Sequence, residues 1–150
     1  MPRCTRRQAL ARVGAGVAAL AMRDGMAQSR PPALSKRDWA AIKRVISDQL
    51  AALRKGDAER AFAYAAEGIR RQLGDAGAFM DMVQSGYADL LHARYTEFLE
   101  GAVIEDAIIQ PLRLVGADNS VRVALYTMQK DGARWRIAGC VIAPSTVKAA

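Results

Sequence analysis

The sequence predicts an α+β domain in which three helices come first and then pack on one face of a curved antiparallel sheet of about three to four strands. Between about residues 36 and 92, apolar residues recur every three or four positions, which is the period of a helix. From Arg94 onward they alternate with polar residues, which is the period of a strand. Turn residues such as Asp131-Gly132 separate the alternating runs, so we expect the strands to form a meander.

Residues 1–27 have the order of a cleavable signal peptide. A basic stretch without acids precedes a short apolar run, and small residues then lead to a cut after Ala27. The paired Arg6 and Arg7 stand in a segment that resembles the twin-arginine export motif, although Ala9 occupies a position where phenylalanine is usual. These features predict that the first part of the chain is removed on export.

The leader predicts a periplasmic or secreted protein, with two export routes open. The paired arginines favour the twin-arginine route, but they also occur in ordinary basic leaders, so the general secretion route remains the alternative. The apolar run over 13–22 is far shorter than the roughly 20 residues that cross a bilayer. We therefore expect no membrane segment once the leader is removed.

The remainder of the chain divides into a linker over 28–35, one domain over 36–145 and a short tail over 146–150. The linker contains Pro31-Pro32, which a helix would not accommodate. A chain of about 120 residues is long enough to bury one hydrophobic core. We therefore expect the domain to fold as one unit.

Three polar residues are the expected N-caps of the three helices: Ser35, Asp57 and Asp75. Gly56 ends the first helix, and Gly68 is the expected break in the second. The apolar stripes that the helices would bury are Trp39, Ile42, Ile46, Leu50 and Leu53; Ala58, Phe62, Ala65, Ile69 and Leu73; and Phe79, Met82, Val83 and Leu90. We expect these stripes to form the helical half of the core.

The alternating runs predict strands at about 94–100, 102–114, 120–129 and 134–143. Pro111 cannot donate a backbone hydrogen bond, so its strand is expected at an edge or bulged at that point. If Asp131-Gly132 is the two-residue turn, both faces of the last hairpin are apolar, and the sheet needs a cover on each face. We expect a second copy of the chain to supply the second cover, with the N-terminal segment or a ligand as alternatives.

The same register sets Ala124 opposite Gly139, and two small facing residues would leave a notch in the sheet. Arg122 and Tyr126 flank this notch, so it could hold a small anion or a carbonyl compound. The alternative is that a large helix side chain fills the space, since protein interiors are closely packed.

Several short segments follow one another in a characteristic order over about residues 40 to 143. They are Met82-Val83, Gly86-Tyr87, Arg94, Tyr126-Thr127-Met128, Asp131-Gly132, Trp135-Arg136-Ile137 and Gly139-Cys140. With them the chain resembles the nuclear transport factor 2-like (NTF2-like), or cystatin-like, superfamily, and within it the bacterial family domain of unknown function 4864. The resemblance implies a cone-shaped domain whose curved sheet wraps a cavity closed by the helices. It implies no single activity, because that fold serves isomerases, dehydratases, cyclases and binding modules.

Enzymes of that fold pair an acid with a base in the cavity, and the candidates here are Asp81, Tyr87, His92, Glu97 and Tyr126. No two of them form a recognisable pair in the sequence. We therefore predict a non-catalytic domain that binds a small apolar or anionic ligand or a protein, with a small isomerase, dehydratase or cyclase as the alternative. The predicted ligand-binding residues are Arg122, Tyr126, Gly139, Tyr87 and His92.

Charge and metal-ligating residues argue against several classes of function. Five arginines and one aspartate within residues 1–27 carry four of the seven net positive charges, which leaves three for the rest of the chain. That surplus is a weak footprint for nucleic acid. Beyond the leader the chain has one cysteine, Cys140, and one histidine, His92, so we expect neither an internal disulfide, nor a metal site, nor a cofactor.

Replacing Arg6 and Arg7 together by lysine should abolish export if the twin-arginine route is used, since that receptor reads both guanidinium groups. The measurement is the fraction of mature protein in the periplasm. Undiminished export of the double-lysine variant would assign the protein to the general secretion route.

Overall fold

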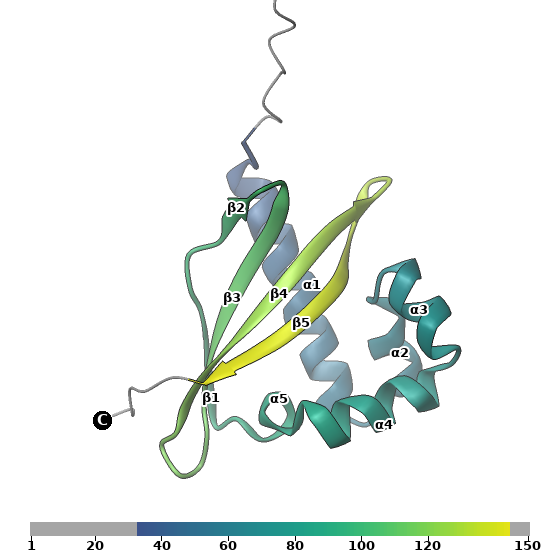
Figure 1. The fold of residues 1–150 in the computed structure, drawn as a ribbon, viewed down its shortest axis with the longest axis vertical. Coiled ribbons are helices and arrows are strands. Elements are labelled where there is room, and N and C mark those ends of the chain that lie inside the picture. Colours follow the sequence, from purple (N-terminus) through teal and green to yellow (C-terminus); the bar gives the residue numbers. More distant parts are fainter. Residues whose placement is uncertain (1–32, 145–150) are drawn as a thin grey trace, which may run out of the picture. The chain divides into compact units, whose positions relative to one another are not determined.

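Helices precede strands along the chain, as the sequence predicts (Figure 1). The computed structural model describes residues 33–144. Arg6, Arg7 and the cut after Ala27 lie outside the described residues, as does the tail over 146–150. The helices are α1 (Lys36–Arg54), α2 (Ala58–Ala63), α3 (Glu67–Leu73), α4 (Ala76–Gly86) and α5 (Ala88–His92), and the strands are β1 (Tyr95–Phe98), β2 (Ala102–Ile104), β3 (Ala107–Val115), β4 (Val121–Asp131) and β5 (Arg134–Pro144). The α+β class is confirmed, with five helices and five strands among the described residues.

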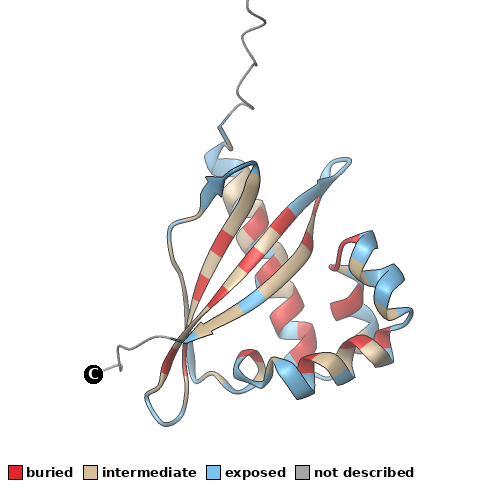
Figure 2. Cartoon of the chain, viewed as in Figure 1, coloured by how far each residue is buried: buried red, intermediate tan, exposed pale blue. Residues whose placement is uncertain are grey.

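Helix α1 begins and ends where its sequence signals place it. The Ser35 hydroxyl accepts a hydrogen bond from the Asp38 amide, and the Asp38 carboxylate accepts one from the Ser35 amide, which is a complete capping box. One side of α1 buries Ile42, Ile46 and Leu50 against the sheet (Figure 2). The longest helix is therefore also the main cover of the inner face of the sheet.

The predicted second and third helices are each broken in two. Between α2 and α3, the segment Tyr64–Ala66 leaves the helix and pairs with β5. The Ile137 amide donates to the Tyr64 carbonyl at 2.9 Å, and the Ala66 amide donates to the Ile137 carbonyl at 2.8 Å. Gly68 lies within α3, so it is not the break. Hydrogen bonding to a strand edge, and not glycine, ends the helix here.

The sheet is antiparallel and runs in the order β1-β3-β4-β5, with β2 also paired to β3. The strand predicted over 102–114 is in fact two strands, separated by a turn at Glu105 and Asp106, both of which have positive φ. Contrary to the prediction, Pro111 lies neither in an edge strand nor at a bulge, because β3 pairs on both flanks and its register with β4 is regular. Pro111 stands between the point where pairing with β1 stops and the point where pairing with β2 starts. Proline is accommodated there because one flank of the strand is locally unpaired.

The predicted register of the last hairpin is wrong by two residues. Asp131 pairs with Arg134, so the turn consists of Gly132 and Ala133. Gly132 has a φ of 59°, at the first central position, where a type II′ turn requires glycine. Trp135 still faces the core, because a shift of two residues preserves the face that each side chain occupies.

A β-bulge then changes the faces in the rest of β5. Thr127 pairs with Gly139 and Met128 with Ile137, which leaves Ala138 without a partner on β4. Ala124 therefore lies opposite Ile142, not Gly139. The predicted notch between two small residues does not form.

The outer face of the sheet is apolar, in agreement with the prediction for the last hairpin. Tyr95 is 51% exposed, Ile104 is 58% exposed and Val141 is 64% exposed. No helix within residues 33–144 lies on this face (Figure 1). The inner face, by contrast, is covered by α1 and carries the buried side chains of the core.

Trp135→Ala should lower the free energy of unfolding by about 3–5 kcal/mol, because the indole is 6% exposed and packs in the core. Chemical denaturation measures this change. Val103→Ala on β2 is the control, and its half-exposed side chain predicts a change within about 0.5 kcal/mol. Equal stability of the two variants would show that Trp135 is not a core residue.

Candidate functional site

A cavity of about 280 Å³ lies between the helices and the inner face of the sheet. Its walls come from α1, α3, α4 and α5 on one side and from β4 and β5 on the other. The lining residues are Gln49, Leu53, Ala65, Ile69, Gln72, Leu73, Phe79, Met82, Val83, Tyr87, Leu90, Tyr126, Ile137, Ala138, Gly139 and Cys140. At roughly 30 Å³ per water molecule, the space holds about nine waters or a ligand of about as many non-hydrogen atoms.

Tyr126 brings an unpaired hydroxyl to this otherwise mainly apolar cavity. The residue lies in the middle of β4 and is 1% exposed. Its hydroxyl oxygen is buried and has no hydrogen-bond partner within residues 33–144. Burial raises the pKa of this hydroxyl well above its ordinary value, so it is protonated and can donate.

The bulge at Ala138 turns Cys140 toward the same cavity, where the thiol neighbours the Tyr126 hydroxyl. The two groups do not meet hydrogen-bond geometry. Burial raises the pKa of the Cys140 thiol to about 12, and the Tyr126 hydroxyl acts in the opposite direction. A thiol that stays protonated at neutral pH is unreactive, so Cys140 lines the cavity as a weakly polar group and not as a nucleophile.

Tyr87 links the helices to β5 at one side of the cavity. It stands at the junction of α4 and α5, and its hydroxyl donates to the Cys140 carbonyl at 3.0 Å. Because this hydroxyl already has an acceptor, it holds the wall in place. Gly139 lines the cavity with its backbone alone, since a Cβ added to it would lie on the outer face and meet Thr127 at ordinary contact distance.

Gln49 is a cavity residue that our sequence reasoning missed. It lies on the buried side of α1 between Ile46 and Leu53 and is 4% exposed. Its side-chain amide donates to the Ala61 carbonyl at 3.2 Å, which ties α1 to α2. A polar residue within an apolar stripe was the available signal, since a buried amide needs a partner.

Arg122 and His92 lie away from Tyr126, in a separate hollow of about 310 Å³ beside the loop after β3. The Arg122 guanidinium contacts the Asp89 carboxylate at 3.1 Å, and His92 is exposed. The five predicted ligand-binding residues therefore fall into two groups. Tyr126, Tyr87 and Gly139 share the cavity, whereas Arg122 and His92 do not reach it.

The acidic candidates for catalysis also lie elsewhere. Asp81 is exposed on α4, and Glu97 forms an ion pair with Arg113 at 2.5 Å on β1 and β3. The described lining of the cavity contains no carboxylate and no imidazole. Acid–base chemistry at Tyr126 would therefore lack the base that such enzymes use.

Over residues 33–144, no three histidine, cysteine, aspartate or glutamate side chains gather closely enough to hold a metal ion. In the same range, no helix is both long and apolar enough to cross a membrane.

The model of one protein family, Domain of unknown function (DUF4864), matches residues 35–150 of the chain. This range contains every described helix and strand, and so includes all of the residues that line the cavity. A search of curated proteins gave no significant match.

The raised pKa of Cys140 predicts a loss of stability in alkali. The folded protein retains this proton up to about pH 12, whereas the unfolded chain releases it near a pKa of 9.0. The contribution is therefore complete below about pH 9 and is lost as the pH rises toward 12. Between about pH 8 and about pH 10.5, the free energy of unfolding should fall by roughly 1–2 kcal/mol more in the parent than in Cys140→Ala. Parallel pH profiles of the two proteins would contradict burial of the thiol.

Proposed function

Since the chain belongs to the family Domain of unknown function (DUF4864), whose description carries no activity, we propose from the cavity itself that the domain binds a small, mostly apolar molecule with one hydrogen-bond acceptor. The observation that carries this proposal is the buried Tyr126 hydroxyl without a partner. Leaving such a donor unpaired costs about 1–3 kcal/mol, which an acceptor on a ligand would recover.

The remaining walls define the rest of the ligand. Aliphatic and aromatic side chains from both layers, such as Leu53, Phe79 and Ile137, surround the hydroxyl. These groups favour a hydrocarbon body, while the hydroxyl favours a carbonyl or an ether oxygen at one point. A molecule of about nine non-hydrogen atoms matches the volume.

Binding is favoured over catalysis by the chemistry of the lining. Tyr126 and Cys140 both have raised pKa values, so both are protonated at neutral pH. The cavity supplies a hydrogen-bond donor and an apolar enclosure for a ligand. Its described lining contains no group that would accept a proton from a substrate. This supports a carrier or a sensor domain.

We also propose that the domain has the NTF2-like fold and that two copies of the chain form a homodimer. Helices on one face of an antiparallel sheet, with a cavity between the layers, support membership of that superfamily. The apolar outer face, with Tyr95 and Val141 exposed, supports a homodimer formed through the sheet. The leader over 1–27 supports a periplasmic or secreted location.

Tyr126→Phe should weaken binding of 2-octanone, a ketone of about nine non-hydrogen atoms, by roughly tenfold, because the ring remains and only the donor is lost. Chemical-shift titration of the labelled protein measures the dissociation constants. Without ligand, the variant should be at least as stable as the parent, since it no longer buries an unpaired hydroxyl.

Tyr95→Phe is the matched control, because it removes a hydroxyl from the exposed outer face. If the parent binds 2-octanone and both variants bind it as tightly as the parent does, the result would contradict the role of Tyr126. Native mass spectrometry of protein purified from the periplasm should in addition show a bound molecule of low mass. A parent that binds neither 2-octanone nor any co-purified molecule would contradict the proposed function itself.

A further inference from the structure

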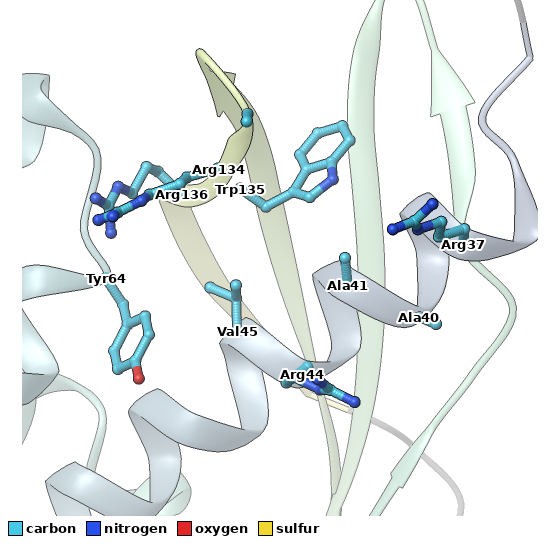
Figure 3. A pocket seen from close by; sticks show the side chains of 10 residues that line it. Arg37, Ala40, Ala41, Arg44, Val45, Tyr64, Arg134, Trp135 and Arg136 are labelled. Carbon is cyan, nitrogen blue, oxygen red and sulfur yellow. The ribbon is translucent and has the colours of Figure 1, made fainter.

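A second hollow, separate from the cavity, lies between α1 and the start of β5 (Figure 3). Its volume is about 470 Å³. The residues that line it, which together we name the arginine groove, are Arg37, Ala40, Ala41, Arg44, Val45, Tyr64, Ala133, Arg134, Trp135 and Arg136. Four of these ten residues are arginines, and none is acidic.

The groove follows from the spacing of residues on α1. Arg37, Ala40, Ala41 and Arg44 recur at the helical period, so they share one side of the helix. The small side chains of Ala40 and Ala41 leave space on the helix surface between Arg37 and Arg44. On the opposite wall, β5 begins with alternating arginines on either side of Trp135, whose indole is 6% exposed.

The charges of the groove are largely uncompensated. The guanidinium groups of Arg37, Arg44 and Arg134 make no hydrogen bond or ion pair within residues 33–144, whereas the Arg136 guanidinium donates to the Ala63 carbonyl at 2.8 Å. The neighbouring Asp38 carboxylate is engaged by Ser35 and by Lys130. The four groove arginines exceed the net charge of three that residues 28–150 carry, so positive charge is concentrated here.

We propose that the arginine groove binds an acidic, extended peptide segment of a partner protein. The arginines lie apart, with Arg37 at one end and Arg134 and Arg136 at the other (Figure 3). A single compact anion would meet only some of them, but carboxylates spaced along a chain would meet all. Guanidinium groups also match carboxylates in a two-bond geometry.

The backbone of β5 offers a further reason for a peptide. β5 is the edge strand of the described sheet, so its outer edge is open to pairing wherever no other segment of the chain occupies it. The segment Tyr64–Ala66 already pairs with this edge at Ile137, next to the groove. An extended segment lying over Ala40 and Ala41 would reach the same edge at Arg134–Arg136.

Nucleic acid fits the groove less well. Single-stranded nucleic acid is held by aromatic faces on which bases stack. Trp135 is buried, and the Lys130 ammonium group lies 5.4 Å from the centre of its ring, so that face is already covered. The groove therefore has the positive charge that nucleic acid needs, but it lacks an exposed aromatic face on which bases could stack.

The test uses a fluorescein-labelled peptide of about twelve residues that alternates glutamate and valine, observed by fluorescence anisotropy. Arg37→Gln/Arg44→Gln should raise its dissociation constant by roughly tenfold at low salt. Lys36→Gln/Lys43→Gln removes the same charge at the same spacing from an adjacent side of α1, outside the groove. This control should change binding by less than about twofold.

Three outcomes would overturn the proposal. The first is a parent that does not bind the peptide, and the second is a lysine control that weakens binding as much as the arginine variant does. The third is displacement of the peptide by a single-stranded oligonucleotide at a lower concentration than an unlabelled copy of the peptide requires. Retained binding of 2-octanone by the arginine variant would confirm that the variant is folded and that the two sites are independent.

Discussion

The β-bulge at Ala138 is the constraint on which the cavity depends. Before the bulge, Trp135 and Ile137 face the core, and after it Cys140 and Ile142 do. An unbroken strand would instead turn Val141 inward, since side chains alternate with a period of two. The extra residue therefore decides which groups stand beside Tyr126, and it places a thiol there.

The helical layer adapts to the same strand. The segment Tyr64–Ala66 leaves the helix to hydrogen-bond with Ile137, and Tyr87 interrupts the next helix to reach the Cys140 carbonyl. At each interruption the helical hydrogen bonding stops, and the chain instead contacts β5 on either side of Ala138. These contacts hold the helices against β5, and the cavity lies between them and the apolar inner face of that strand.

The sequence predicts the starts of α1, α2 and α4 and most of the buried positions in the apolar stripes, because capping and burial are local properties. Ser35, Asp57 and Asp75 cap the helices as expected, and Trp135 is buried as expected. The helix breaks, the bulge and the register of the last hairpin depend on contacts between distant segments, and no local pattern records them. The site was predicted in part for the same reason: Tyr126 and Tyr87 share the cavity, but Arg122, assigned through the wrong register, contacts Asp89 instead.

The reactivity of two thiols tests the position of the bulge most directly. In a Cys4→Ser background, Cys140 should react with a thiol reagent at about pH 8 at least roughly a hundredfold more slowly than a cysteine introduced as Gly139→Cys with Cys140→Ser. Cys140 faces the cavity with a pKa of about 12, whereas position 139 lies opposite Thr127 on the outer face. Rapid reaction of Cys140 together with protection at position 139 would mean that β5 runs without the bulge, and it would contradict this account of the cavity.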